Sequence, residues 1–174
     1  MRLRSLCPCV ALLLLASGRA QAFIERLYSL REVMDESSHI YVGRLEKVDA
    51  TRRLALAKVE RTLKGKAEFA LIKMNLGLGP SDHVAYLMGL LKEGQPIILF
   101  VKRERNDIAS CVSAGDTWFQ LFSNMEPDPS SVWWRLSHVE VAMGRTFHGT
   151  TPDLIRIISD VVARWPKVAI LVLT

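Results

Sequence analysis

The chain has 174 residues, of which 49% are hydrophobic and 24% are charged. These values are typical of one globular domain that can bury a core, and they exclude a largely disordered chain. The formal net charge is +5, but most of this excess lies near the N-terminus.

Residues 1–22 are predicted to be a signal peptide. Two arginines lie within the first four residues, Val10 to Ala16 form an apolar run, and Ala20-Gln21-Ala22 fits the small-x-small cleavage pattern. An uncleaved anchor is the alternative, but this run is far shorter than the ~20 residues that span a bilayer. We therefore expect a secreted or periplasmic protein that begins at Phe23 and has no stable membrane insertion after cleavage.

Cleavage would leave 20 basic and 18 acidic residues, a net charge of +2. A near-neutral domain lacks the basic surface that polyanion binding requires, and export separates it from nucleic acids, so no nucleic-acid partner is expected. Cys7 and Cys9 would be removed with the leader, which leaves Cys111 alone and excludes an internal disulfide. We expect Cys111 to be a buried, inert thiol; a reactive thiol is the alternative.

After the leader, the sequence predicts an amphipathic helix followed by strands. A second helix interrupts the strands, and a third follows them. Residues 23–38 place apolar side chains at three- and four-residue intervals, which is the period of a helix. Alternating or continuous apolar runs predict strands at 39–48, 54–63, 69–76, 97–101, 109–114 and 117–122, with a bulge at Gly43 and a hairpin turn at Gly115-Asp116. Further helices are expected from a Ser81 N-cap to about Gly94, and from a threonine cap within 149–153, with Pro152 in the first turn, through Arg164; a last strand-like run follows at 168–174.

Three strands, a helix and then further strands is the element order of the OB fold, a five-stranded barrel. We therefore predict a mainly β protein with an OB-like βββαββ barrel over 23–125 that includes the N-terminal helix. Residues 126–174 would form a Pro-rich linker, a Trp-containing segment and a packing helix. The barrel interior is predicted to contain Ile40, Val42, Val59, Ile72, Met74, Leu99 and Val101, with the helices packed outside.

Three segments carry a family resemblance: IYVGRL at 40–45, VERTLKG at 59–65 and LKEGQPIILF at 91–100. They resemble the netrin or tissue-inhibitor-of-metalloproteinase type of secreted OB barrel, and more closely its bacterial extracytoplasmic relatives. In that family's inhibitors, a Cys-x-Cys at the mature N-terminus chelates the protease metal. Here Cys7-Pro8-Cys9 would be lost with the leader, so the resemblance implies the fold but not this inhibitory activity.

No catalytic, cofactor or metal constellation is expected. The chain has four histidines, at His39, His83, His138 and His148. Their spacing does not match that of a metal site. His138-Val139-Glu140 matches half of a zinc-deaminase motif, but no Pro-Cys-x-x-Cys follows. Neither a nucleophile elbow nor a complete dinucleotide loop is present.

One cluster is a candidate for binding a partner: Trp133, Trp134, His138, Arg145, Phe147 and His148. Adjacent tryptophans on a strand cannot both point into a core, and exposed aromatics beside arginine are common interface anchors. Alternatively, these residues plug the barrel's open end. Two functions remain: a non-enzymatic module that binds an extracytoplasmic protein or glycan, or a small secreted hydrolase or hydrolase inhibitor.

Overall fold

The computed structural model describes residues 28–141 and 143–164. Its strands are β1 (His39–Asp49), β2 (Leu54–Lys64), β3 (Leu71–Asn75), β4 (Pro96–Glu104), β5 (Asp107–Ala114), β6 (Thr117–Asn124) and β7 (Trp133–Val139). Its helices are α2 (Leu30–Glu36), α3 (Ser81–Leu90), α4 (Met143–Thr146) and α5 (Thr151–Arg164), with short 3-10 turns η1 (Leu76–Leu78) and η2 (Pro129–Ser131). The predicted leader and the run at 168–174 lie outside the described residues.

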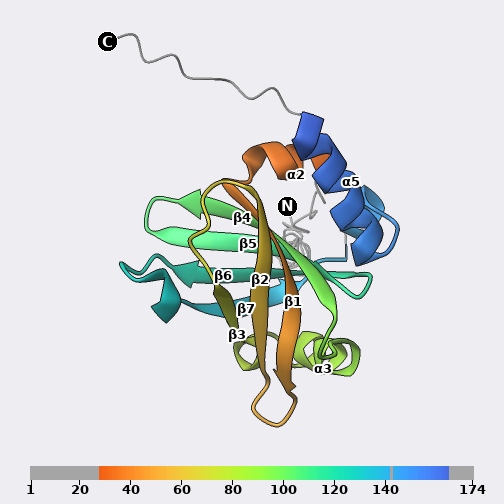
Figure 1. The fold of residues 1–174 in the computed structure, drawn as a ribbon. Coiled ribbons are helices and arrows are strands. Elements are labelled where there is room, and N and C mark those ends of the chain that lie inside the picture. Colours follow the sequence, from red (N-terminus) through yellow and green to blue (C-terminus); the bar gives the residue numbers. More distant parts are fainter. Residues whose placement is uncertain (1–27, 142, 165–174) are drawn as a thin grey trace, which may run out of the picture.

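The strands form a closed barrel in the order β1-β2-β3-β7-β6-β5-β4, with β4 pairing back onto β1. All neighbours are antiparallel except β3 and β7, which are parallel over three residue pairs. α2 and α5 lie together on one side of the barrel, and α3 lies at its opposite end (Figure 1). The expectation of a mainly β protein built on a barrel is therefore confirmed.

The expected strand number is wrong, because the barrel has seven strands rather than five. β7 closes the barrel, and β5 and β6 lie between it and β4. The sequence placed β7 in the Trp-containing segment after the linker and not in the barrel. The β6–β7 register shifts between Gln120 and Leu121, which pair with His138 and Leu136, so Ser137 is an extra residue on β7 that lets this strand bend.

The barrel interior is filled by apolar side chains. Of the predicted interior residues, Ile72, Met74, Leu99 and Val101 lie in this interior cluster, and Val59 packs against it while half-buried. Side chains of α3, including Leu87, join the same cluster and close one barrel end. The helix begins at Ser81 with Pro80 at the N-cap position, so the predicted Ser81 cap is wrong by one residue.

A second cluster lies outside the barrel wall. Ile40 and Val42 on β1 belong to it, together with Ile98 and Phe100 on β4 and Ile158 on α5. The prediction that Ile40 and Val42 face the interior is therefore wrong. β1 is buried on both faces along its first half, because the helices cover its outer surface, so its sequence does not alternate and parity cannot identify the inner face.

Gly43 is the predicted bulge, and the structure shows why it is glycine. The β1–β2 register shifts between Val42 and Gly43. A Cβ added at Gly43 would lie 2.4 Å from the Lys58 carbonyl oxygen. The close approach of β2 at this point therefore requires the absence of a side chain.

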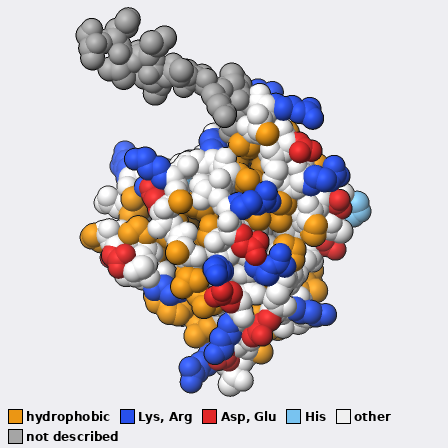
Figure 2. Space-filling model, viewed as in Figure 1, with side chains coloured by type: hydrophobic (Ala, Val, Ile, Leu, Met, Phe, Trp, Pro, Cys, Tyr) orange, Lys and Arg blue, Asp and Glu red, His pale blue; other side chains and the backbone are white. Residues whose placement is uncertain are grey.

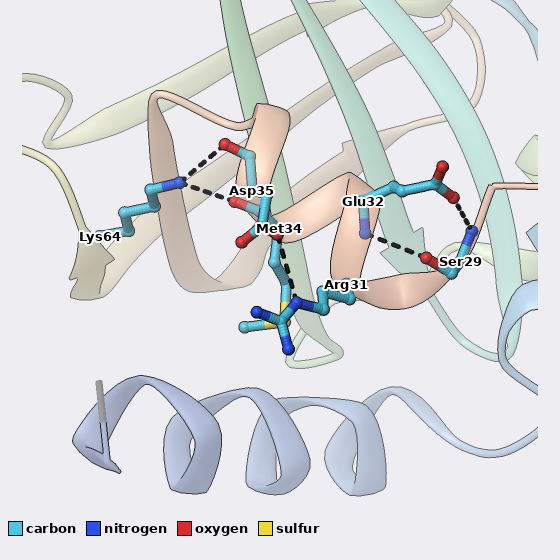
Figure 3. Close-up of polar contacts among 6 residues, drawn as sticks. All are labelled: Ser29, Arg31, Glu32, Met34, Asp35 and Lys64. Atoms are coloured by element: carbon cyan, nitrogen blue, oxygen red, sulfur yellow. Dashed lines mark hydrogen bonds and ion pairs between the residues drawn. The ribbon is translucent and has the colours of Figure 1, made fainter. Parts of the chain in front are cut away.

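α2 is only seven residues long, and side chains satisfy both of its ends (Figure 3). At its N-terminus, Ser29 and Glu32 form a reciprocal capping box. At its C-terminus, Lys64 at the end of β2 donates to the carbonyl oxygens of Met34 (2.7 Å) and Asp35 (3.2 Å). Burial lowers the pKa of Lys64, and the nearby Asp35 acts in the opposite direction. A helix this short is marginal alone, so these contacts hold it against the barrel.

α5 begins as the sequence predicts. The Thr150 hydroxyl accepts a hydrogen bond from the backbone N–H of Asp153 (3.3 Å), and Pro152 lies in the first turn. Among the helices in the described ranges, none combines the length and the apolar composition needed to cross a bilayer.

Candidate functional site

The two tryptophans of β7 occupy opposite environments. Trp134 is completely buried in the barrel interior, where its ring meets Phe69 edge-on at 5.8 Å between centroids. Trp133 points outward and is 45% exposed. Strand alternation therefore separates the pair, and only Trp133 can contact a partner.

The other members of the predicted cluster do not share one surface with Trp133. Phe147 is half-buried and packs against the outer cluster under the helices. His138 lies on β7 and contacts Glu140, whereas His148 is exposed in the loop before α5. The side chain of Arg145 lies outside what the structure describes.

Trp133 lines a groove of about 280 Å³ on the outer face of β1, β2, β3 and β7. Leu54, Ala55 and Leu56 of β2 form its apolar part. Its charged lining consists of Lys47, Asp49, Arg52 and Lys73. In Figure 2, hydrophobic side chains gather over this region of the barrel, beside Lys and Arg side chains.

Cationic and aromatic side chains alternate across three neighbouring strands beside this groove. Lys73 on β3 pairs in register with Trp133 on β7, and Arg135 on β7 pairs with Phe122 on β6. The Lys73 Nζ lies 5.3 Å from the Trp133 ring centroid, and the Arg135 guanidinium carbon lies 6.0 Å from the Phe122 ring centroid. We call these four residues the outer stripe.

Sequence reasoning missed Lys73, Arg135 and Phe122. Each lies on the outward parity of its strand, so alternation alone could have placed them on the solvent side. Their proximity depends on β7 lying between β3 and β6, and the sequence did not predict that order.

A larger groove, of about 500 Å³, lies between α3 and the ends of β6 and β7. Asp82, His83 and Tyr86 of α3 line one side of it, and Asp116 and Glu140 lie among the residues of the other side. The backbone N–H of Val139 donates to His83 Nδ1 (3.1 Å). A neutral His83 therefore carries its proton on Nε2.

A hydrogen-bonded Ser-His-Glu chain lies at the end of β7. The Ser137 hydroxyl is 2.9 Å from His138 Nδ1, and His138 Nε2 is 3.0 Å from a Glu140 carboxylate oxygen. This is the residue order of a nucleophile, a base and an orienting acid. However, only Glu140 of the three lines the neighbouring groove.

Cys111 lies on the outer face of β5, where it is half-buried beside the outer cluster rather than fully buried as predicted. Burial raises the pKa of its thiol far above the ordinary value, and the Glu140 carboxylate acts in the same direction. Both effects disfavour the thiolate, which is the reactive form.

A second polar cluster lies where β1 begins. His39 is nearly buried and stacks on Tyr41, and its Nε2 lies 3.6 Å from the Glu68 carboxylate. Glu68 in turn forms an ion pair with Arg103. Burial lowers the pKa of His39, and the positive charge of Arg103 lowers it further. Burial also raises the pKa of Tyr41 to about 12, while its hydroxyl donates to the Lys66 carbonyl oxygen (2.9 Å).

Within residues 28–141 and 143–164, His, Cys, Asp and Glu side chains do not gather in a group able to hold a metal ion. Comparisons with protein-family models, curated proteins and solved structures find no match to this chain.

Proposed function

We propose that the protein is an extracytoplasmic, non-enzymatic binding module with an OB-like barrel of the netrin and metalloproteinase-inhibitor type, enlarged by β5 and β6. The observation that carries the binding function is Trp133, a large aromatic side chain left 45% exposed on a barrel face next to a groove lined by cations. Exposed tryptophan and arginine provide much of the binding energy at interfaces.

The distribution of side chains supports binding over catalysis. The interior is packed with apolar residues, so the barrel does not enclose a ligand chamber within its described part. The groups whose pKa is shifted by burial, His39, Tyr41, Lys64 and Cys111, all lie outside the largest groove. An enzyme concentrates shifted groups in its cleft.

The test compares variants of the purified mature chain in the capture of partners from an extracytoplasmic extract that contains both proteins and polysaccharides. Trp133→Ala should abolish capture while the variant stays folded, with a melting temperature only a few degrees below that of the parent. Tyr86→Ala is the matched control, because Tyr86 is also an exposed aromatic, at 52%, on a different face. Equal capture by the parent and Trp133→Ala would refute the proposal.

Export is part of the same proposal and is tested separately. N-terminal sequencing of the protein recovered from the extracytoplasmic fraction should begin at Phe23. Recovery of Met1 or Arg2 at the terminus would contradict it.

A small secreted hydrolase is the second candidate, favoured by the Ser137–His138–Glu140 chain. A serine-directed fluorophosphonate probe distinguishes the two functions, because an activated serine reacts with it and an ordinary hydroxyl does not. The binding proposal predicts no labelling. Labelling that is lost in Ser137→Ala would instead establish the hydrolase.

A further inference from the structure

We infer that the outer stripe and its groove bind an anionic polysaccharide, a carbohydrate polymer that carries carboxylate or sulfate groups. The inference rests on the proposed function, because it names the ligand class of the same surface. It is carried by the charge of the groove, by the shape of the stripe and by the pairing of the strands beneath it.

The groove is cationic. Lys47, Arg52 and Lys73 line it against a single carboxylate, Asp49, which is 3.9 Å from the Arg52 Nε. Within the described ranges, neither Lys47 nor Lys73 forms an ion pair with a carboxylate, although the charge of Lys73 acts on Asp128. Their charges favour a ligand that supplies the missing anions.

A further carboxylate, Asp128, lies near enough to Lys73 to sense its charge, and its own hydrogen bonds come from Ser130. Asp128 accepts hydrogen bonds from the backbone N–H and hydroxyl of Ser130, and these bonds, with a smaller contribution from Lys73, lower its pKa. Arg135 lies exposed beyond Trp133 and presents a planar guanidinium, which suits a carboxylate or a sulfate.

The stripe runs across neighbouring strands of the barrel wall. It crosses β3, β7 and β6 and continues from the groove on β2, and neighbouring strands lie ~4.8 Å apart, so the surface extends about 14 Å across the sheet. Trp133 and Phe122 are both partly exposed along this length, with Lys73 over the ring of Trp133 and Arg135 over the ring of Phe122. A sugar ring can pack a C–H face on an aromatic ring while its charged substituent reaches a neighbouring cation. An extended charged glycan therefore matches the alternation of the stripe.

The same observations disfavour other polymers. A peptide strand adds to a free sheet edge, and in the described barrel every strand is paired on both sides. An amphipathic helix needs a continuous apolar groove, whereas cations interrupt this stripe. Nucleic acid carries a much denser charge, and the chain after the predicted leader has only two more basic than acidic residues.

Isothermal titration of the mature chain with defined oligosaccharides tests the inference. The probes are a polygalacturonate oligosaccharide for carboxylates, a heparin oligosaccharide for sulfates, a neutral dextran oligosaccharide and a single-stranded DNA oligonucleotide. At least one anionic saccharide should bind, more weakly as salt is raised, and the neutral saccharide should not bind. Comparison of the first two probes identifies the anionic group.

Substitutions in the outer stripe test whether the saccharide binds there. Trp133→Ala and Lys73→Gln should each weaken binding by roughly tenfold or more. Trp133→Phe keeps an aromatic ring and should lose less. Tyr86→Ala and Lys92→Ala remove an exposed aromatic and an exposed charge elsewhere, and they should bind as the parent does. A melting curve for each variant establishes that it is folded.

Three outcomes would overturn the ligand class: no binding of either anionic saccharide, equal binding of the neutral one, or tighter binding of DNA. Loss of saccharide binding in the control variants but not in Trp133→Ala would show that the saccharide does not bind at the outer stripe. If no saccharide binds but Trp133→Ala still loses a protein partner in the capture assay, the proposed function holds and only this inference fails.

Discussion

Adjacent tryptophans on β7 give a matched pair of substitutions that tests the structure directly. Trp134 is completely buried, and a buried tryptophan removes up to ~250 Å² from water, or about 6 kcal/mol at ~25 cal/mol per Å². Observed costs of Trp→Ala in cores are about 3–5 kcal/mol. With 45% of its surface exposed, Trp133 buries about half as much area as Trp134. Because the unfolded chain already buries part of that area, we expect Trp133→Ala to cost about 1–2 kcal/mol.

A third variant separates packing from hydrogen bonding at the same site. The indole N–H of Trp134 is buried and donates no hydrogen bond within the described residues. An unpartnered buried donor costs about 1–3 kcal/mol. Trp134→Phe removes that donor and keeps an aromatic ring, so the two effects oppose each other. We expect Trp134→Phe to be far less destabilising than Trp134→Ala.

Urea unfolding followed by far-UV circular dichroism measures these differences. The free energy of unfolding is expected to be ~5–15 kcal/mol for a domain of this kind, so Trp134→Ala should shift the midpoint strongly and Trp133→Ala only slightly. The slopes of the transitions should agree, so that the midpoints can be compared. Equal destabilisation by the two alanine variants, or a larger effect of Trp133→Ala, would refute the assignment of inner and outer faces on β7.

Three further predictions follow from the buried groups. Cys111 in the native protein should react with Ellman's reagent more slowly than after denaturation, because its half-buried environment raises its pKa; equal rates would contradict this shift. His39 has a lowered pKa from burial and from Arg103, so only the unfolded chain gains its proton as pH falls below ~6.5. Stability should therefore decrease from pH 7 toward pH 5.5, and a flat profile, or one unchanged in His39→Asn, would exclude this cause. Ile72→Asp should prevent folding, while Val59→Asp, at a half-buried position, should be milder; the reverse order, measured by thermal melting, would show the interior to be misassigned.

Most strands were predictable because their sequences alternate or form short apolar runs between turns. The hairpin at Gly115-Asp116 illustrates this, since both residues adopt the positive φ that the turn requires. β7 was missed because adjacent tryptophans obscure its alternation and its first neighbour in the barrel, β3, is distant in sequence. For Ile40 and Val42, burial on both faces of β1 removed the pattern that would have shown which side faces the interior.

The candidate site was predictable only in part. The sequence identified Trp133 as a member of a cluster, but it grouped Trp133 with neighbours along the chain rather than with neighbours across the sheet. Lys73 is far from Trp133 in sequence, and register pairing alone brings them together. A surface built across strands depends on strand order, and local patterns do not encode that order.

The parallel seam between β3 and β7 also determines when this chain can fold. Only three residue pairs close the barrel there, and they join Leu71–Asn75 to a strand that is synthesised much later. The barrel cannot close before Trp133–Val139 is available, and such distant pairings make folding slow. A nascent chain would therefore keep its barrel open until most of it had been synthesised.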